Sequence, residues 1–195
     1  QARILLSGAA PIAVENLQFF TSLDLLIGEV YGQSEDSGPT AISLPGFIRI
    51  GAAGKPLPGV QVRIAEDGEI LVKGPNVFVG YRSRPEATAE TLQDGWLHSG
   101  DLGRIDEDGF IYVTGRKKDL LITSGGKNIS PGNIEADLMN LHLVEHAVVV
   151  GDSRHYLSAL LTLKTDVLQS FAQQHNLPGT LAQWRTSPQV HAELQ

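Results

Sequence analysis

Short apolar runs and one amphipathic stretch alternate along the first third of the chain. Arg3–Ser7 and Leu25–Val30 are short and mostly apolar, which is typical of buried strands. Between them, apolar residues at helical spacing predict a helix from Pro11 to about Ser22. A strand, a helix and a strand within about 30 residues form a βαβ unit. We therefore expect the two strands to be parallel.

A period of two replaces the helical spacing near residue 60. Pairs of strand-like runs flank an Asp-Gly dipeptide twice, at 60–65 with 69–73 and at 101–105 with 110–114. Asp-Gly favours a two-residue hairpin turn, because both central residues need a positive φ. The pattern predicts two hairpins in one antiparallel β subdomain. Gly80-Tyr81-Arg82, between them, is interpreted as a structural turn before a helix near Glu86–Leu92.

Helical and strand patterns mix again after a charged segment, Arg116–Asp119, which is the best candidate for a linker. Ser130-Pro131 has the residues of a helix start. Strands are predicted at Val144–Val150 and Leu157–Leu163, and a helix at Val167–His175. The predicted fold class is α/β plus β plus α+β. Residues 1–45 would end a parallel α/β sheet subdomain, 46–116 would form the antiparallel β subdomain, and 117–195 an α+β domain, which the family resemblance described below implies to be mobile and incomplete.

Composition narrows the class of protein. The 195 residues are 42% apolar and 19% charged, as in a globular protein, and the net charge of −7 argues against a general nucleic-acid binder. The absence of cysteine excludes disulfides and thiolate metal sites. No apolar run approaches the roughly 20 residues of a membrane-spanning helix. Because the chain starts at Gln1 and stops at Gln195 within a helical pattern, we expect a piece of a longer protein.

The carboxyl ends of the two parallel strands should bring two loops together, Gly8–Pro11 and Tyr31–Glu35, where open α/β sheets bind ligands. Small residues in the first loop would admit a flat ligand, and Tyr31 offers an aromatic face. Ser34 offers a hydroxyl to a phosphate, and Glu35 a carboxylate to a cation such as Mg²⁺. The plainer alternative is that Tyr31 is core, Ser34 caps a turn and Glu35 is solvated.

The second Asp-Gly hairpin places an acid opposite a base. If Glu107 pairs with Phe110, counting back along both strands puts Asp101 opposite Arg116. One interpretation is a solvated cross-strand ion pair, which contributes little. The other is a clamp, in which the carboxylate accepts hydrogen bonds from the vicinal hydroxyls of a sugar and the guanidinium donates to the same sugar.

Three motifs in sequence order resemble those of the AMP-forming acyl-CoA synthetases of the adenylate-forming superfamily. They are Gly-Trp-Leu-His-Ser-Gly-Asp-Leu-Gly, then Asp-Gly-Phe, then Gly-Arg-Lys-Lys-Asp. The run from Gly115 to Glu135 is most similar to long-chain fatty-acid ligases, including the bubblegum-type group, and the resemblance reaches about Asp166. It implies a ligase that converts fatty acid, ATP and CoA to acyl-CoA, AMP and diphosphate through an acyl-adenylate. A peptide-synthetase adenylation domain, a luciferase-like enzyme and a non-catalytic nucleotide-binding module remain alternatives.

The resemblance also implies roles for residues. Tyr31 and the loop at 8–11 would bind adenine, Asp101 and Arg116 the ribose, and Ser34, where threonine is more usual, the α-phosphate. Glu35 would bind Mg²⁺, and Lys118 would be the hinge between two half-reactions. Gly125 and Gly126 would line the pantetheine tunnel of CoA. The full predicted set that contacts nucleotide or CoA is Gly8, Ala9, Ala10, Pro11, Tyr31, Gly32, Gln33, Ser34, Glu35, Asp101, Arg116, Gly125 and Gly126.

Two parts of such an enzyme are expected outside this chain. The resemblance places the loop for the β- and γ-phosphates before Gln1 and the adenylating lysine after Gln195. We therefore expect no catalytic residue in these 195 residues, no ligase activity from them alone, and weak binding of AMP. The expected partners are fatty acid, ATP and CoA, with no nucleic acid, in the cytoplasm. Peripheral membrane contact, the length of the acid and the oligomeric state are left open.

Overall fold

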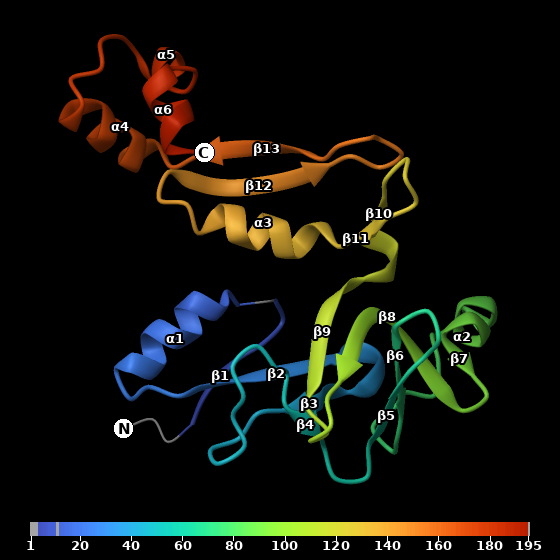
Figure 1. Ribbon diagram of the computed structural model, residues 1–195. Coiled ribbons are helices and arrows are strands. Elements are labelled where there is room, and N and C mark those ends of the chain that lie inside the picture. Colours follow the sequence, from blue (N-terminus) through green and yellow to red (C-terminus); the bar gives the residue numbers. More distant parts are fainter. Residues whose placement is uncertain (1–3, 11, 195) are drawn as a thin grey trace. The chain divides into compact units, whose positions relative to one another are not determined.

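The structure is a computed structural model that describes residues 4–10 and 12–194 (Figure 1). The chain divides into two compact units, residues 1–119 and residues 120–195. Within the described ranges, none of the helices combines the length and the apolar character needed to cross a membrane.

The first unit begins with a four-stranded sheet. Its elements are β1 (Leu5–Ser7), α1 (Val14–Ser22), β2 (Ile27–Gln33), a one-turn 3₁₀ helix η1 (Ser34–Asp36), β3 (Gly38–Ile42) and β4 (Lys55–Pro56). The strand order is β1-β2-β3-β4, and β1 and β2 are parallel, as the βαβ pattern predicts. The β2–β3 and β3–β4 pairs are antiparallel. This sheet therefore takes in residues as far as Pro56, beyond the expected limit of 45.

Two element boundaries differ from the sequence-based prediction. The helix α1 begins at Val14, and Pro11 lies outside the described residues. Strand β2 begins at Ile27 and continues through Gln33, so residues 31–33 are strand and not loop. The apolar run misled the prediction because its first residues, Leu25 and Leu26, are 43% and 50% exposed. Pairing with β3 extends the strand past the run, since β3 provides partners as far as Gln33.

The second sheet of this unit is antiparallel. It contains β5 (Gln61–Ile64), β6 (Glu69–Lys73), β7 (Leu92–Gln93), β8 (Trp96–Ile105) and β9 (Ile111–Arg116), with α2 (Pro85–Thr91) between β6 and β7. The strand order is β5-β6-β8-β7, and β9 pairs with β8. Both predicted hairpins are present. One apolar cluster contains residues from both sheets: Tyr31, Ala41, Ala53, Ile70, Val72, Leu97 and Ile111. The shared core fixes the two sheets against each other within this unit.

The second unit is a small α+β module. It contains β10 (Leu121–Ile122), β11 (Asn128–Ile129), α3 (Pro131–Met139), β12 (Val144–Val150), β13 (Ser158–Leu163), α4 (Thr165–Gln174), α5 (Leu181–Trp184) and α6 (Pro188–Glu193). Helix α3 lies along the β12–β13 hairpin (Figure 1). The predicted helix start is correct, although the Ser130 hydroxyl makes no capping hydrogen bond. The tail, which carries no clear pattern in the sequence, adds Val190 and Trp184 to the core of this unit.

Candidate functional site

The parallel β1–β2 pair brings the first two predicted loops together. Ser7 is in register with Glu29, so the residues after β1 run beside the end of β2. A Cβ added to Gly8 would lie 3.2 Å from the carbonyl oxygen of Val30, which is tight for any larger residue. Ala9 has a φ of 67°, an uncommon left-handed conformation for alanine. Gly8, Ala9 and Ala10 are exposed, so the described part of this loop leaves its backbone open to a ligand.

Tyr31 lies where the two sheets meet. Its residue is 9% exposed and belongs to the shared apolar core, as the plainer alternative expects. Its hydroxyl, however, donates a hydrogen bond of 2.9 Å to Oδ2 of Asp101 in β8. Burial raises the pKa of Tyr31 far above its ordinary value, and the negative charge of Asp101 adds to that rise. The hydroxyl is therefore a donor at every physiological pH, and it links the first sheet to the second.

Asp101 and Arg116 face each other across the β8–β9 pair, as predicted. Nε of Arg116 lies 3.2 Å from Oδ1 of Asp101, while Tyr31 donates to the other carboxylate oxygen. The Asp101 side chain is 11% exposed and the Arg116 side chain 72%. A mostly buried carboxylate is thus paired with a guanidinium that is largely exposed to solvent. This unequal burial distinguishes the pair from a fully solvated surface ion pair.

The turn that leads to this pairing differs from the prediction. The amide of Asp106 donates to the carbonyl of Phe110, and only Gly109 of the loop has a positive φ, so the loop has three residues and not two. The predicted pairing of Glu107 with Phe110 is wrong. The side chain of Asp106 explains the difference, because its Oδ1 accepts hydrogen bonds from the amides of Asp108 and Phe110.

An irregularity in the same hairpin restores the predicted pair. Leu102 faces Gly115, but Gly103 faces Val113, which leaves one extra residue on β9. The longer turn shifts the register by one residue, and this bulge shifts it back. Asp101 and Arg116 are opposite each other because these two departures cancel.

The residues after β2 form a tight 3₁₀ turn. The amide of Gln33 donates to Oδ1 of Asp36 over 2.9 Å, and the Gln33 side chain accepts from the Asp36 amide. Thr40 also donates to the Asp36 carboxylate, which is buried. Burial raises the pKa of Asp36, although these hydrogen bonds lower it in part. The inward Asp36 anchors the turn and leaves Ser34 exposed.

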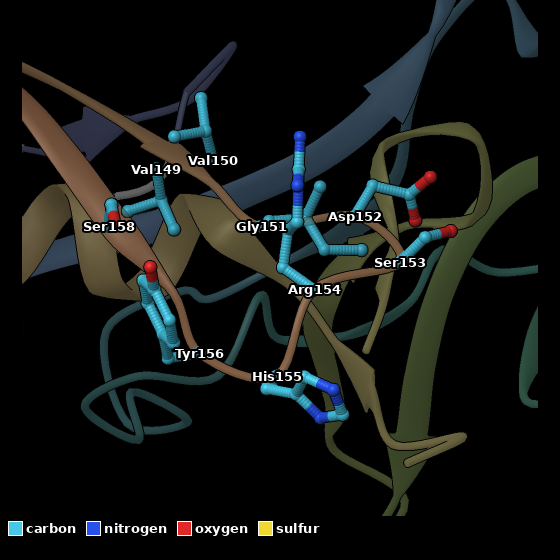
Figure 2. A pocket seen from close by; sticks show the side chains of 10 residues that line it. Val149, Val150, Gly151, Asp152, Ser153, Arg154, His155, Tyr156 and Ser158 are labelled. Atoms are coloured by element: carbon cyan, nitrogen blue, oxygen red, sulfur yellow. The ribbon is translucent and has the colours of Figure 1, made fainter. Parts of the chain in front are cut away.

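Gly125 and Gly126 lie in the second unit, in the β10–β11 hairpin. The loop is exposed, and Gly126 has a φ of 77°, which favours glycine. Ser124 beside them contacts the 151–156 loop through the carbonyl of Arg154 and through Nδ1 of His155. The 151–156 loop lines a hollow of about 860 Å³ (Figure 2). The glycine turn is therefore held by a second loop of its own unit.

Comparison with known protein families identifies both parts of the chain. Residues 1–82 match the family model "AMP-binding enzyme", and residues 118–185 match "AMP-binding enzyme C-terminal domain". The chain belongs to the AMP-binding enzyme family. The two matches occur in the order that the sequence motifs imply.

Relatives of this AMP-binding chain include fatty-acid ligases. It is 42% identical over 194 residues to the long-chain-fatty-acid–CoA ligase FadD15 of Mycobacterium bovis, which covers 98% of this chain and 32% of that protein. It is 46% identical over 168 residues to the long-chain-fatty-acid–CoA ligase ACSBG2 of Xenopus laevis, covering 83% of this chain and 23% of the relative. The chain thus spans about a third, or less, of the curated relatives that it matches.

A solved structure supports the fold of the AMP-binding chain. O-succinylbenzoate coenzyme A synthetase (MenE) of Bacillus subtilis, in complex with ATP and magnesium ion, is 33% identical and superposes with a TM-score of 0.74. The match covers 88% of this chain and 40% of that protein. The fold class of mixed sheets with few helices is therefore that of an adenylate-forming enzyme.

Glu35 has the chemistry of a magnesium ligand that relies on phosphates. Its Oε1 accepts a hydrogen bond of 2.6 Å from the hydroxyl of Tyr81. No group of three or more His, Cys, Asp or Glu that could hold a metal occurs in residues 4–10 and 12–194. Magnesium commonly binds one or two carboxylates and completes its shell with water and substrate phosphates. A single carboxylate beside the exposed Ser34 therefore fits Mg²⁺ that arrives with ATP.

Sequence reasoning missed a charged cluster beside the Asp101–Arg116 pair. Glu69 is buried and accepts hydrogen bonds from the Gly100 amide over 2.9 Å and from Nζ of Lys117 over 3.0 Å. Its Oε2 also lies 3.1 Å from Nδ1 of His98, and Lys117 lies 2.6 Å from Asp67. Burial alone would raise the pKa of Glu69, but hydrogen bonds from His98, Lys117 and Gly100 lower it below its ordinary value.

This cluster holds the immediate neighbours of both candidate ribose ligands, because Gly100 precedes Asp101 and Lys117 follows Arg116. The apolar run Ile70–Val72 in β6 predicts a strand but does not show whether the carboxylate of Glu69 before it is buried or solvated. The Lys-Lys dipeptide at 117–118 likewise reads as a solvated turn. Only the tertiary contacts distinguish the two lysines: both are exposed, and Lys117 is paired with two acids, Asp67 and Glu69.

Proposed function

We propose that this chain forms part of the adenosine monophosphate site of a long-chain fatty-acid–CoA ligase. The observation that carries the proposal is the connected set of Tyr31, Asp101 and Arg116. An aromatic ring, a buried carboxylate and a guanidinium are linked by contacts of 2.9 and 3.2 Å. The similarity to FadD15 and ACSBG2 supports a long-chain fatty acid as the substrate.

In the first half-reaction, a carboxylate oxygen of the fatty acid attacks the α-phosphorus of ATP. A new oxygen–phosphorus bond forms, the bond to the bridging oxygen breaks, and diphosphate leaves with the electron pair. Two anions must approach each other, so cationic groups are needed to stabilise the transition state. Mg²⁺ held by Glu35 would neutralise charge on the phosphate oxygens. The exposed hydroxyl of Ser34 would donate to an α-phosphate oxygen.

Asp101 and Arg116 would orient the ribose. Each oxygen of the Asp101 carboxylate has one protein partner, and a carboxylate oxygen can accept more than one hydrogen bond. The remaining lone pairs can accept from two vicinal hydroxyls, while Arg116 keeps donors available because most of its side chain is exposed. Adenine would lie between Tyr31 and the exposed backbone of Gly8–Ala10. These contacts fix the position of the α-phosphorus relative to the attacking oxygen.

In the second half-reaction, the thiolate of CoA attacks the acyl carbonyl carbon. A carbon–sulfur bond forms, the carbon–oxygen bond to the phosphate breaks, and AMP leaves. Lys118 would be the pivot between the two half-reactions, and Gly125 and Gly126 would contact the pantetheine arm. The division of the chain into units at residue 119 supports a pivot near Lys118.

Acid-dependent ATP–pyrophosphate exchange on the full-length protein tests the proposal. A panel of straight-chain acids from short to long should stimulate exchange most at the long end, whereas the isolated 195-residue chain should form no acyl-CoA. Glu107→Gln, in the exposed β8–β9 loop, is a matched control for acidic site variants. Exchange driven best by amino acids or aryl acids would point to another adenylating enzyme. If no acid of the panel stimulated exchange, the chain would instead belong to a non-catalytic nucleotide-binding module.

A further inference from the structure

The segment between β6 and α2 lies on the Ser34–Ser37 turn although some 40 positions separate the two. Asn76 donates from Nδ2 to the carbonyl of Asp36 over 3.0 Å, and its own carbonyl accepts from the Ser37 hydroxyl over 2.8 Å, 39 positions away. The amide of Phe78 donates to the carbonyl of Glu35 over 2.7 Å. The backbone of the turn is therefore held from outside its own strand pair.

Tyr81 completes this contact through a side chain. Its hydroxyl donates to Oε1 of Glu35 over 2.6 Å, the short distance expected for a hydrogen bond to an ionised carboxylate. The Tyr81 ring packs edge-on against Phe78, with 4.8 Å between ring centroids. Its amide donates to Oγ1 of Thr88 in α2 over 2.9 Å. Ring, backbone and hydroxyl are all held, so the hydroxyl has a fixed direction.

The residue before Tyr81 indicates that this geometry is specified. Gly80 has a φ of 140°, which L side chains rarely adopt. A Cβ at Gly80 would also lie 2.6 Å from the Thr88 methyl group, closer than real Cβ contacts. Glycine therefore lets the chain pass under α2 and deliver Tyr81 to Glu35.

We propose that Tyr81 is a positioning residue for the metal-binding carboxylate of Glu35, an inference that rests on the proposed function. With Oε1 held by the phenol, the Glu35 carboxylate would present Oε2 to the cation in a fixed direction. Among the described residues, Oε2 has neither a hydrogen bond nor an ion pair. A carboxylate already fixed in direction loses less side-chain entropy when it binds a cation. Tyr81 thereby raises the affinity for Mg²⁺–ATP without touching either.

Calorimetric binding of ATP at rising free Mg²⁺, on the full-length protein, gives a readout that does not depend on turnover. Tyr81→Phe keeps the ring and the Phe78 contact but removes the donor. We expect the free Mg²⁺ needed for half-maximal tightening of ATP binding to rise about tenfold or more, as for the loss of one hydrogen bond to a charged group. Tyr112→Phe is the matched control, because Tyr112 donates to the carboxylate of Asp106, elsewhere in the second sheet. It should leave the Mg²⁺ dependence unchanged.

A double-mutant cycle separates positioning from simple bracing of the fold. In a Glu35→Gln background the carboxylate is gone, so adding Tyr81→Phe should cause no further change in the Mg²⁺ dependence. Equal effects of Tyr81→Phe in both backgrounds would overturn the inference, and so would an unchanged Mg²⁺ dependence in the single variant. If the unmodified protein bound ATP equally with and without Mg²⁺ and showed no exchange, the proposed function would fail and take this inference with it. If the unmodified protein showed normal exchange and Tyr81→Phe left the Mg²⁺ dependence of ATP binding unchanged, only this inference would fail and the proposed function would stand.

Discussion

The hydroxyl of Tyr31 donates to Oδ2 of Asp101 over 2.9 Å, although 70 positions separate the two residues. This bond joins the last part of β2 to the middle of β8, inside the core that both sheets share. It also shows that the two interpretations of Tyr31 do not exclude each other. The ring is a buried core side chain, while the hydroxyl reaches the Asp101 carboxylate of the candidate site.

Tyr31→Phe should destabilise the first unit by about 1–3 kcal/mol, because it removes the donor from a buried, charged acceptor. The apolar contacts of the ring remain, so the loss measures the hydroxyl. Urea unfolding followed by the fluorescence of Trp96, in a Trp184→Phe background, reports on this unit. Tyr112→Phe, whose hydroxyl also donates to a carboxylate but in a more exposed position, should cost less. Equal losses in the two variants would contradict the special role of the Tyr31–Asp101 bond.

Asp101→Asn and Arg116→Gln should weaken AMP binding unequally in the full-length protein. The buried carboxylate accepts a hydrogen bond from Tyr31 and forms an ion pair with Arg116, so its replacement should lower the affinity by about tenfold or more. The exposed guanidinium is screened by solvent, and its loss should cost only a fewfold and depend on salt. Calorimetry at low and high salt measures both effects. Arg104→Gln, in the same hairpin but stacked on Tyr112, is the control for Arg116. A larger loss for Arg116→Gln than for Asp101→Asn would reverse the assignment.

Gly32→Ala should severely destabilise the chain, by about 3 kcal/mol or more. An added Cβ would lie 1.8 Å from the carbonyl oxygen of Gly38 in the paired strand, and backbone atoms cannot move aside. The predicted set includes Gly32 as a nucleotide contact, and that prediction stays open; what the structure shows is a packing role. Gly132→Ala, where no atom lies within 4 Å of the added carbon, is the matched control. Similar unfolding midpoints for the two variants would refute the steric explanation.

The local patterns predicted the elements well because each depends on its own period. The βαβ unit, both hairpins and the β12 strand follow from runs and alternation that are visible within a few residues. The Asp101–Arg116 pair was predicted from a turn type that does not occur. Its pairing is correct because the longer turn and the bulge at Leu102–Gly103 cancel. Periodicity alone contains no signal for either departure.

The contacts that complete the site could not be predicted, because they join segments with no local relationship. Tyr81 and Glu35 are 46 positions apart, and Lys117 and Glu69 are 48 apart. The local sequence around each of these four residues does not distinguish a contact of this kind from a solvated side chain. One signal was available for Tyr81: a glycine before an aromatic residue suggests a constrained backbone that delivers the ring to a defined place. That signal does not identify the partner.

Lys118→Pro should separate the two half-reactions of the full-length protein. Proline fixes φ near about −65°, so rotation at this position is lost while the side-chain charge is also removed. Lys118→Ala removes the same side chain but leaves the backbone free, and it is the matched control. We expect ATP–pyrophosphate exchange to persist in both variants. Acyl-CoA formation should fall at least about tenfold only in the proline variant, because that variant can no longer reach the conformation needed for the second half-reaction. Equal losses in both variants would assign the effect to the lysine side chain and not to the hinge.

The cluster around Lys117 predicts a specific pH dependence of stability. Burial of Glu69 raises its pKa, but hydrogen bonds from His98 and Lys117 outweigh burial, so the pKa lies below the ordinary 4.5. The stability that Glu69 contributes is therefore present above pH 4.5 and is lost as the pH falls through its lower value in the folded state. The pKa of Lys117 is raised from 10.5 by Asp67 and Glu69, so its contribution is present below pH 10.5 and is lost as the pH rises further.

Lys117→Met should therefore lower the urea midpoint of the first unit most between about pH 5 and 10, and the difference from the unmodified chain should shrink toward pH 3. The comparison of two curves is needed because Asp36, whose pKa is raised by burial, changes stability in the opposite direction over the acid range. Its effect is common to both chains and cancels in the difference. Lys127→Met, an exposed lysine in the second unit, should leave the curve of the first unit in place. If the Lys117→Met and unmodified curves ran parallel down to pH 3, the Lys117–Glu69 pair would not be the source of the acid sensitivity.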